Sequence, residues 1–431
     1  MFSFIRYVFI TILFIQVAAT APVFAGDELK NVVPEKAGFS AKRLASVDAL
    51  MTRLVSEKEL NGVVTIISRH GKIIYQKAVG MRDQEAGLPM MQDTIFRIYS
   101  MTKPVIGTAM MILFEEGKWK LDDPIYKYIP QFRGLKVYSG DDGSGNPILK
   151  DPDHAPTMRE LMTHTAGFTY GVIGDTPVDR MYREKGVLDP GSTLADMIHK
   201  LAEIPLLYQP GTRWVYSVSA DIQGYLVEKL SGRSLPDFLQ TRIFDPLNMR
   251  DTGFSVPQDK RNRFAKLYAF DEKTHSLHPA SSEMFGVRDY TLPVSFPSGG
   301  AGLVSTARDY MRFCQMLLNG GSLGGARILA PGTVNLIRAN HLPAGVTFAP
   351  GSGFGLDFAV TNDPVAAGTL AGKGTYFWGG AAGTWFWIDP ENDIVYISMI
   401  QRIGAGGPGS PLDTRHLSTT ALYQALVNPE K

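Results

Sequence analysis

A chain of 431 residues with 44 % hydrophobic and 20 % charged residues has the composition of an ordinary globular protein, which excludes a disordered or fibrous chain. Its formal net charge of +1 gives no electrostatic attraction to nucleic acid or to an anionic surface. The single cysteine, Cys314, excludes an internal disulfide, and we expect it to be a small buried hydrophobic residue.

The first 25 residues have the pattern of a secretory signal peptide. One positive charge, Arg6, precedes an apolar stretch from Tyr7 to about Ala18, and small residues stand where a signal peptidase binds in "VFA". An uncleaved membrane anchor is the alternative, but the apolar stretch is short for a spanning helix. We therefore expect cleavage after Ala25, export to a periplasm or to the medium, and no stable membrane association afterwards.

The mature chain begins with an expected helix and hairpin. Apolar residues recur at every third or fourth position over 39–59, which is typical of a helix with one buried face. Two β-branched runs around His70 and Gly71 predict a hairpin over 62–80. Further helical patterns, separated by loops rich in Gly, Pro and Asp, lie at about 104–117, 157–163, 193–203, 219–231, 235–243 and 306–318.

Strands return near the end of the chain. Residues 375–402 predict at least two strands joined by a Pro-Glu-Asn-Asp turn, and 412–427 predicts a last helix. Strands at both ends with helices between them favour an α+β fold whose sheet is built from both termini. We expect a signal peptide at residues 1–25, a discontinuous sheet domain at 26–125 and 290–431, and an inserted, mainly helical domain at 126–289.

Ser100 and Lys103 are the first candidates for chemistry. They lie in "YSMTKP" (99–104), where a polar tract turns into an apolar helical run. Residues three apart on a helix share a face, and a lysine shielded from water can activate a serine as a nucleophile. Because S-x-x-K occurs by chance roughly once in a chain of this length, the spacing alone also fits an ordinary helix start with a solvated lysine.

Tyr216 and a glycine pair are the next candidates. Tyr216 stands on a short loop before a predicted helix, where its phenol could relay a proton or be a half-buried core residue. Gly379 and Gly380 lie in a predicted strand, which glycine weakens unless something approaches the backbone closely. The glycines would be explained if this were an edge strand whose N–H groups face a substrate, and these groups would then supply half of an oxyanion hole. The alternative is a bulge among core aromatic residues.

In this order, the three segments resemble the motifs of the serine β-lactamase and penicillin-binding-protein superfamily, in particular its class C-like branch and the related family VIII esterases. That superfamily carries S-x-x-K, then Y-x-N or Y-x-x, then K-T-G or a W-G-G or H-x-G variant on a strand. Here the motifs are "SMTK" (100–103), "YSV" (216–218) and "WGG" (378–380). The resemblance covers essentially the whole mature chain. It implies a β-lactamase/transpeptidase-like fold, an antiparallel sheet flanked by helices, with a cleft against the helical domain.

The resemblance also implies a role for each motif residue. Ser100 would attack the acyl carbonyl and Lys103 would accept its proton, while Tyr216 would share the base work or protonate the leaving group. The backbone N–H groups of Ser100 and of Ala381, the residue after "WGG", would hold the oxyanion. How Lys103 and Tyr216 divide the proton is a property of the coupled pair. No cofactor and no metal is implied.

Two departures from the class C pattern bear on the substrate. Class C β-lactamases have a lysine at the position of Trp378 and an asparagine at that of Val218, which contact the carboxylate and the amide side chain of a β-lactam. Trp378 and Val218 supply neither contact, and with Gly379 and Gly380 we expect them to form a more apolar substrate site. This resembles the W-G-G esterases. We therefore expect an exported serine hydrolase that cleaves small-molecule carboxylic esters through a Ser100 acyl-enzyme.

Two alternatives stay open. A D-amino-acid peptidase or weak β-lactamase acting on cell-wall-like substrates would fit export, although Trp378 and Val218 argue against it. A catalytically silent binding protein on the same fold is disfavoured by the intact motif residues. We interpret His164 as structural, and His275 and His278 lack the cysteine or carboxylate partners of a metal site.

Overall fold

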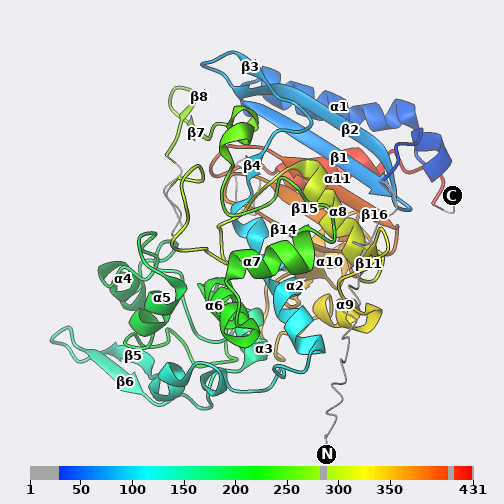
Figure 1. Cartoon of the computed structure of the whole chain (residues 1–431). Helices are drawn as coiled ribbons and strands as arrows, with labels where there is room; N and C mark the ends of the chain where they lie inside the picture. The colour runs from blue at the N-terminus through cyan, green and yellow to red at the C-terminus, as the bar shows by residue number, and fades with distance from the viewer. Residues whose placement is uncertain (1–28, 282–288, 406–411, 430–431) are drawn as a thin grey trace, which may run out of the picture.

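The computed structural model describes residues 29–281, 289–405 and 412–429 (Figure 1). The predicted signal peptide at 1–25 lies outside these residues. Within the described ranges, no helix combines the length and the apolar character that a membrane crossing requires.

An eight-stranded antiparallel sheet forms the centre of one half of the molecule. In sheet order its strands are β12 (Ser352–Phe354), β13 (Ala359–Thr361), β14 (Tyr376–Gly379), β15 (Trp385–Asp389), β16 (Ile394–Met399), β1 (Gly62–Arg69), β2 (Lys72–Asp83) and β3 (Leu88–Pro89). Strand β1, from the beginning of the chain, pairs with β16, from its end. The α+β class and the sheet built from both termini are thus as expected.

The β1–β2 hairpin follows from its turn residues. His70 and Gly71 have φ angles of 52° and 68°, the left-handed conformation that both central residues of a two-residue hairpin turn adopt. Every residue of β1 is buried, because the strand is central and both faces of the sheet are covered. The predicted hairpin is confirmed, and β2 extends it to Asp83.

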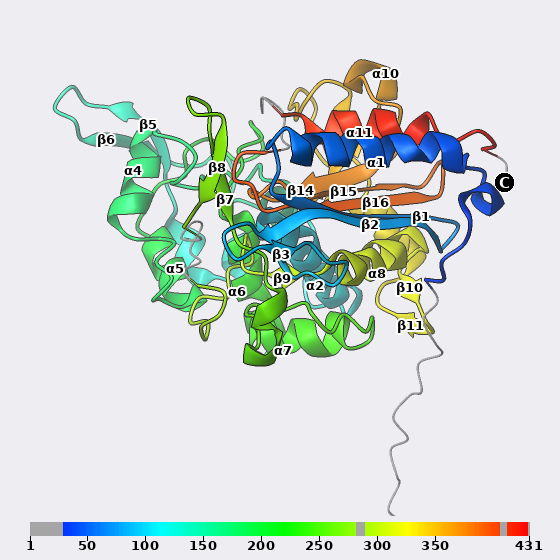
Figure 2. The ribbon, with the colours of Figure 1, turned by 90° about the horizontal axis from the view of Figure 1, so that it is seen from above.

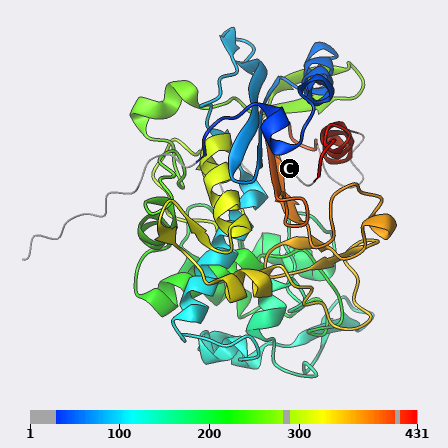
Figure 3. The same ribbon diagram turned by 90° about the vertical axis from the view of Figure 1, so that its right-hand side faces the viewer.

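Helices cover both faces of the sheet. Helices α1 (Ala41–Ser56) and α11 (Thr414–Tyr423) lie side by side on one face, with α8 (Ala307–Leu318) and α2 (Thr102–Glu115) on the other (Figure 2). Figure 3 shows α1 and α11 end-on, with α8 across the sheet from them. Alternate strand residues face the two layers, so Ile67 packs towards α1 while Ile66 packs into the core shared with α2. Cys314, on α8, is fully buried as expected.

The remaining helices and strands are shorter. The helices are α3 (Met158–Met162), α4 (Pro177–Glu184), α5 (Leu194–Leu201), α6 (Ser219–Ser231), α7 (Leu235–Leu239), α9 (Pro331–Ile337) and α10 (Pro364–Ala367). The two-stranded sheets are β4 (Phe96–Arg97) with β9 (Val304–Ser305), β5 (Val137–Asp141) with β6 (Pro147–Lys150), β7 (Tyr268–Asp271) with β8 (Ser276–Pro279), and β10 (Ser322–Leu323) with β11 (Ala326–Arg327). Short 3-10 turns cover Pro34–Ala37, Tyr99–Met101, Ile125–Lys127, Pro130–Gly134 and Gln258–Arg263, and a π-turn covers Gln240–Phe244.

Three of the helices between the two ends of the sheet begin with capping boxes. At α3, α4 and α5 a threonine and an acidic residue three positions later satisfy each other's backbone N–H groups. Helix α6 packs against α3 and α5 and also against α2, which brings the segment before α6 towards the start of α2. The division into a sheet domain and an inserted domain at the expected boundaries stays a prediction.

Candidate active site

Ser100 lies in the 3-10 turn that connects β4 to α2. The preceding Tyr99 has a φ of 41°, which is a strained conformation for a non-glycine residue and one that concentrates at functional sites. The turn is held by Leu303, whose N–H donates to the Thr102 hydroxyl at 3.1 Å and whose carbonyl accepts from the Ile98 N–H at 3.1 Å. Pro104 falls in the first turn of α2, where a missing N–H is tolerated. The Ser100 hydroxyl therefore stands at the N-terminal end of a long buried helix.

Ser100, Lys103 and Tyr216 meet at this point. The Ser100 Oγ accepts a hydrogen bond from the Tyr216 hydroxyl at 2.7 Å and a longer one from the Lys103 Nζ at 3.4 Å. Lys103 Nζ also donates to the carbonyl of Gly300 at 2.8 Å and lies 4.5 Å from the centre of the Tyr216 ring. Lys103 is 1 % exposed and Ser100 is 9 % exposed. One serine hydroxyl thus contacts two groups that can exchange a proton with it.

Asp221 fixes the carbonyl that holds Lys103. Its Oδ1 accepts from the Ser298 hydroxyl at 2.6 Å and from the Gly300 N–H at 3.0 Å. A Cβ on Gly300 would lie 2.5 Å from the Tyr170 hydroxyl and 2.6 Å from Asp221 Oδ2, so only glycine fits there. Burial raises the pKa of Asp221, opposed by its hydrogen bonds and by the charge of Lys103.

Aromatic rings surround Tyr216. His164 lies 5.1 Å, Trp378 5.7 Å and Trp214 6.0 Å from its ring centre. His164 hydrogen-bonds Ser217 through Nδ1 at 3.0 Å, and burial together with the charge of Lys103 holds its pKa well below the ordinary value. His164 is therefore neutral and packs behind Tyr216, which agrees with its interpretation as a structural residue.

A different neighbour excludes a side chain at each of the two glycines of "WGG". A Cβ on Gly380 would overlap the carbonyl of Ile98, so glycine lets the end of β14 approach the Ser100 turn. A Cβ on Gly379 would overlap the guanidinium of Arg415. An edge strand was one of the two alternatives that the sequence left open for "WGG", but β14 is not at the edge of the sheet, because β13 lies beyond it. However, β13 pairs only with Tyr376 and Phe377, which leaves the Trp378 end unpaired on that side.

The expected oxyanion donors lie at the same place. Ser100 and Ala381 both line one pocket, and neither backbone N–H donates a hydrogen bond to another residue of the described chain. Two uncommitted N–H groups beside a serine hydroxyl are the arrangement that a developing oxyanion requires.

The pocket over Ser100 has a volume of about 1090 Å³ and is mainly apolar. Its wall includes Trp214, Phe348, Phe377, Trp378 and the glycines of "WGG". Among the described lining residues, Arg415 alone carries a formal charge. Val218, expected at the substrate site, does not line this pocket; it is fully buried in the core.

Several residues of the site are not predicted from the sequence. Asp221 has the pattern of an ordinary acidic residue in the first turn of a helix, and Arg415 that of a helix surface residue. Tyr170 and Phe348 lie in loops without a motif. Nothing local marks these residues, because their positions depend on contacts between segments far apart in the chain.

Comparison with known proteins gives the family. The Beta-lactamase family model matches residues 47–420. The chain is 38 % identical over 354 residues to an uncharacterized protein of Mycobacterium tuberculosis, covering 79 % of this chain and 86 % of that one. It is 33 % identical over 365 residues to Esterase EstB of Burkholderia gladioli, covering 80 % and 88 %.

A solved structure agrees with these relatives. EstCE1, described as a hydrolase with promiscuous acyltransferase activity, matches with a TM-score of 0.76 and 29 % identity over 89 % of this chain and 99 % of that chain. The β-lactamase/transpeptidase-like fold and the family inferred from the three motifs are thereby confirmed. The chain belongs to the beta-lactamase family, the superfamily of serine β-lactamases and penicillin-binding proteins, and is a serine hydrolase.

Proposed function

We propose that this protein is an exported esterase that cleaves small-molecule carboxylic esters through an acyl-enzyme on Ser100. The observation that carries the proposal is the Ser100 hydroxyl, in hydrogen-bond contact with Tyr216 and Lys103 at the wall of a largely apolar pocket. The names of EstB and EstCE1 support esters as the substrate class. Export would depend on the signal peptide expected at residues 1–25.

In the acylation step, the Ser100 oxygen forms a bond to the ester carbonyl carbon. Its proton passes to the Lys103–Tyr216 pair, and the negative charge on the carbonyl oxygen is held by the N–H groups of Ser100 and Ala381. The tetrahedral intermediate then breaks its bond to the alcohol oxygen. The pair returns the proton to that oxygen, so the alcohol leaves neutral.

In the deacylation step, water takes the place of the alcohol. The Lys103–Tyr216 pair accepts a proton from the water as its oxygen attacks the acyl carbon. The bond to the Ser100 oxygen breaks, that oxygen recovers a proton, and the carboxylic acid leaves. An apolar wall of Trp378 and Phe348 suits the uncharged parts of an ester.

The test compares three substrate classes on the purified protein without residues 1–25. p-Nitrophenyl esters of graded acyl length, nitrocefin and a D-Ala-D-Ala peptide are assayed side by side. We expect turnover of the esters to exceed that of the other two substrates. Rapid nitrocefin or peptide turnover without ester hydrolysis would replace the proposal with the β-lactamase or peptidase alternative.

The nucleophile is tested by Ser100→Ala and by labelling. We expect the variant to lose ester hydrolysis by about 10³-fold or more, because no other residue forms the acyl-enzyme. A fluorophosphonate should add to Ser100 in mass spectrometry and to nothing in the variant. An adduct on another serine, or activity that survives the substitution, would remove Ser100 from its role.

A further inference from the structure

Arg415 brings a positive charge to the wall of the substrate pocket. It is the second residue of α11, and its guanidinium lies against the backbone of Gly379 on β14. Any side chain larger than hydrogen at position 379 would overlap the guanidinium. Arg415 also lines a second hollow of about 230 Å³ behind Phe377, next to the pocket that contains Ser100. The guanidinium therefore lies where the two spaces meet.

The Arg415 guanidinium makes no ion pair in the described chain, although the nearby carboxylate of Asp413 acts on its charge electrostatically. No carboxylate of the described residues lies within ion-pair distance of its guanidinium, and its buried Nε has no hydrogen-bond acceptor. Burial lowers its pKa to about 10, opposed by Asp413 and Tyr216, so the side chain is still charged at neutral pH. A partly buried charge that makes no ion-pair contact is unfavourable in a folded protein, and a ligand can supply that contact.

We propose that Arg415 binds a carboxylate of the substrate, so that the preferred ester also carries an anionic group. This inference rests on the proposed esterase function and adds the substrate class. A guanidinium pairs with a carboxylate through two parallel hydrogen bonds, which orients the ligand as well as binding it. The sequence predicts an apolar substrate site from Trp378 and Val218. That expectation does not include the positive charge of Arg415, which lies on α11.

A different role for Arg415 would produce different kinetics. Arg415 and Tyr216 interact electrostatically, so Arg415 could instead act on the catalytic pair. In that case its loss would slow all esters by the same factor. Selective binding of a carboxylate changes the ratio between anionic and neutral esters. The ratio of their kcat/KM values therefore separates the two roles.

The experiment uses two matched pairs of esters. Mono-p-nitrophenyl adipate and its methyl ester differ only in the charge at the far end of the acyl group. 3-Carboxyphenyl butyrate and its methyl ester carry the same difference on the leaving group. We expect the wild-type protein to hydrolyse the anionic member of one pair with a kcat/KM at least ten-fold higher than that of the neutral member. The pair that shows this preference tells whether Arg415 binds a carboxylate on the acyl group or on the leaving group. The preference should weaken as salt is added.

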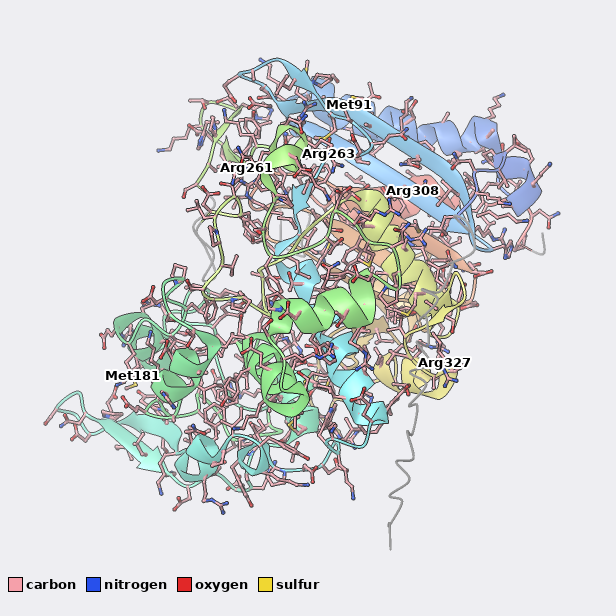
Figure 4. All side chains as sticks on the ribbon, in the orientation of Figure 1. Met91, Met181, Arg261, Arg263, Arg308 and Arg327 are labelled. Atoms are coloured by element: carbon pink, nitrogen blue, oxygen red, sulfur yellow. The ribbon has the colours of Figure 1, made fainter. Side chains whose placement is uncertain are left out.

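The variants are Arg415→Met, Arg415→Lys and the control Arg327→Met. Arg415→Met should lower the anionic-to-neutral ratio at least ten-fold, and Arg415→Lys should retain part of the preference. Arg327 is exposed on the β10–β11 hairpin, where Figure 4 labels it, and does not line the pocket. Arg327→Met removes the same charge from the protein and should leave the ratio unchanged. Circular dichroism confirms that each variant is folded.

Three results would overturn the assignment of Arg415. They are a wild-type preference for the neutral esters, an unchanged ratio in Arg415→Met, and an equal loss on both members of each pair. If the wild-type protein hydrolyses none of the four esters, the proposed esterase function fails instead. Adipate binding to Ser100→Ala, measured by calorimetry, then tests the anion site alone. A ten-fold weaker Kd on adding Arg415→Met supports the site, and an unchanged Kd refutes it.

Discussion

The Ser100 hydroxyl has two proton partners at unequal distances. Tyr216 is the nearer one at 2.7 Å, whereas Lys103 is at 3.4 Å and makes its short hydrogen bond to Gly300 instead. Lys103 also lies 4.5 Å from the centre of the Tyr216 ring. This geometry supports the proposal that Tyr216 is the direct proton partner of Ser100 and that Lys103 assists both residues.

We predict that Tyr216→Phe lowers kcat for p-nitrophenyl butyrate by about 10²–10⁴-fold, since general acid–base catalysis contributes that much. KM should change little, because the ring and its packing stay in place. Tyr225→Phe is the matched control: Tyr225 lies on α6, is partly buried, and does not line the pocket. A loss below three-fold in Tyr216→Phe would assign the proton transfer to Lys103 alone.

The residues predictable from the sequence are those whose chemistry is visible in a motif. Ser100, Lys103 and Tyr216 carry reactive groups at recognisable spacings, and the structure brings them together. Asp221 and Arg415 are ordinary residue types for a helix surface. Their importance comes from burial and from neighbours about 80 and 35 positions away along the chain, which no local pattern contains.

Two elements distant in the chain form the mouth of the site. The turn after β4 supplies Ser100, and the end of β14 supplies Ala381. They approach closely because Gly380 leaves room for the Ile98 carbonyl and for the Thr384 hydroxyl. The proposed oxyanion donors, Ser100 and Ala381, are therefore brought together by backbone packing.

We predict that Gly380→Ala lowers kcat/KM on p-nitrophenyl butyrate by about 10²-fold or more, the usual effect of losing an oxyanion donor. Its Cβ would push β14 away from the Ser100 turn, while the sheet itself keeps its pairing. Gly332→Ala is the control, because a Cβ there meets nothing within 4 Å and α9 gains a better helix former. Near-normal kinetics in Gly380→Ala would show that Ala381 does not hold the oxyanion.

Each helical pattern read from the sequence between the two ends of the sheet corresponds to a helix, including the short helices α3, α5 and α7. The patterns at 39–59 and 219–231 correspond to α1 and α6, since one buried face imposes its period on many residues. Helices α4 and α9, of eight and seven residues, have no expected helix at their positions. The sequence leaves the position of β14 within the sheet open, because its neighbour β13 is a three-residue strand with a weak pattern.

At the scale of the whole molecule, the site lies where the sheet, α2 and α6 converge, and it contains more buried ionisable groups than its motifs suggest. Asp357 follows β12 and lies against α2 and α6. Its Oδ1 accepts from Gln223 Nε2 at 3.1 Å, and its Oδ2 lies against Gly107 without a hydrogen-bond partner. Burial raises its pKa to about 8, opposed by that hydrogen bond and by the charge of Lys103.

This pKa makes the stability of the fold depend on pH in a defined direction. In the unfolded chain an aspartate has a pKa of about 3.9, so between roughly pH 4 and pH 8 the folded protein holds a proton that the unfolded chain has released. The stabilisation is complete below about pH 4 and is lost as the pH rises through 8. The contribution of Asp357 to the free energy of unfolding therefore falls across the neutral range.

We predict that Asp357→Asn, which cannot ionise but can still accept from Gln223, becomes more stable relative to wild type as the pH rises. The difference in the free energy of unfolding should move in favour of the variant by about 1 kcal/mol or more between pH 5.5 and pH 7.5, since one pKa unit corresponds to about 1.4 kcal/mol. Urea unfolding of both proteins at several pH values measures it. Asp259→Asn, at an exposed position, should show a constant difference. A difference that stays constant between pH 5.5 and pH 7.5 would mean that Asp357 is already ionised and stabilised by Lys103, so that the centre of the molecule contains a charge pair rather than a protonated acid.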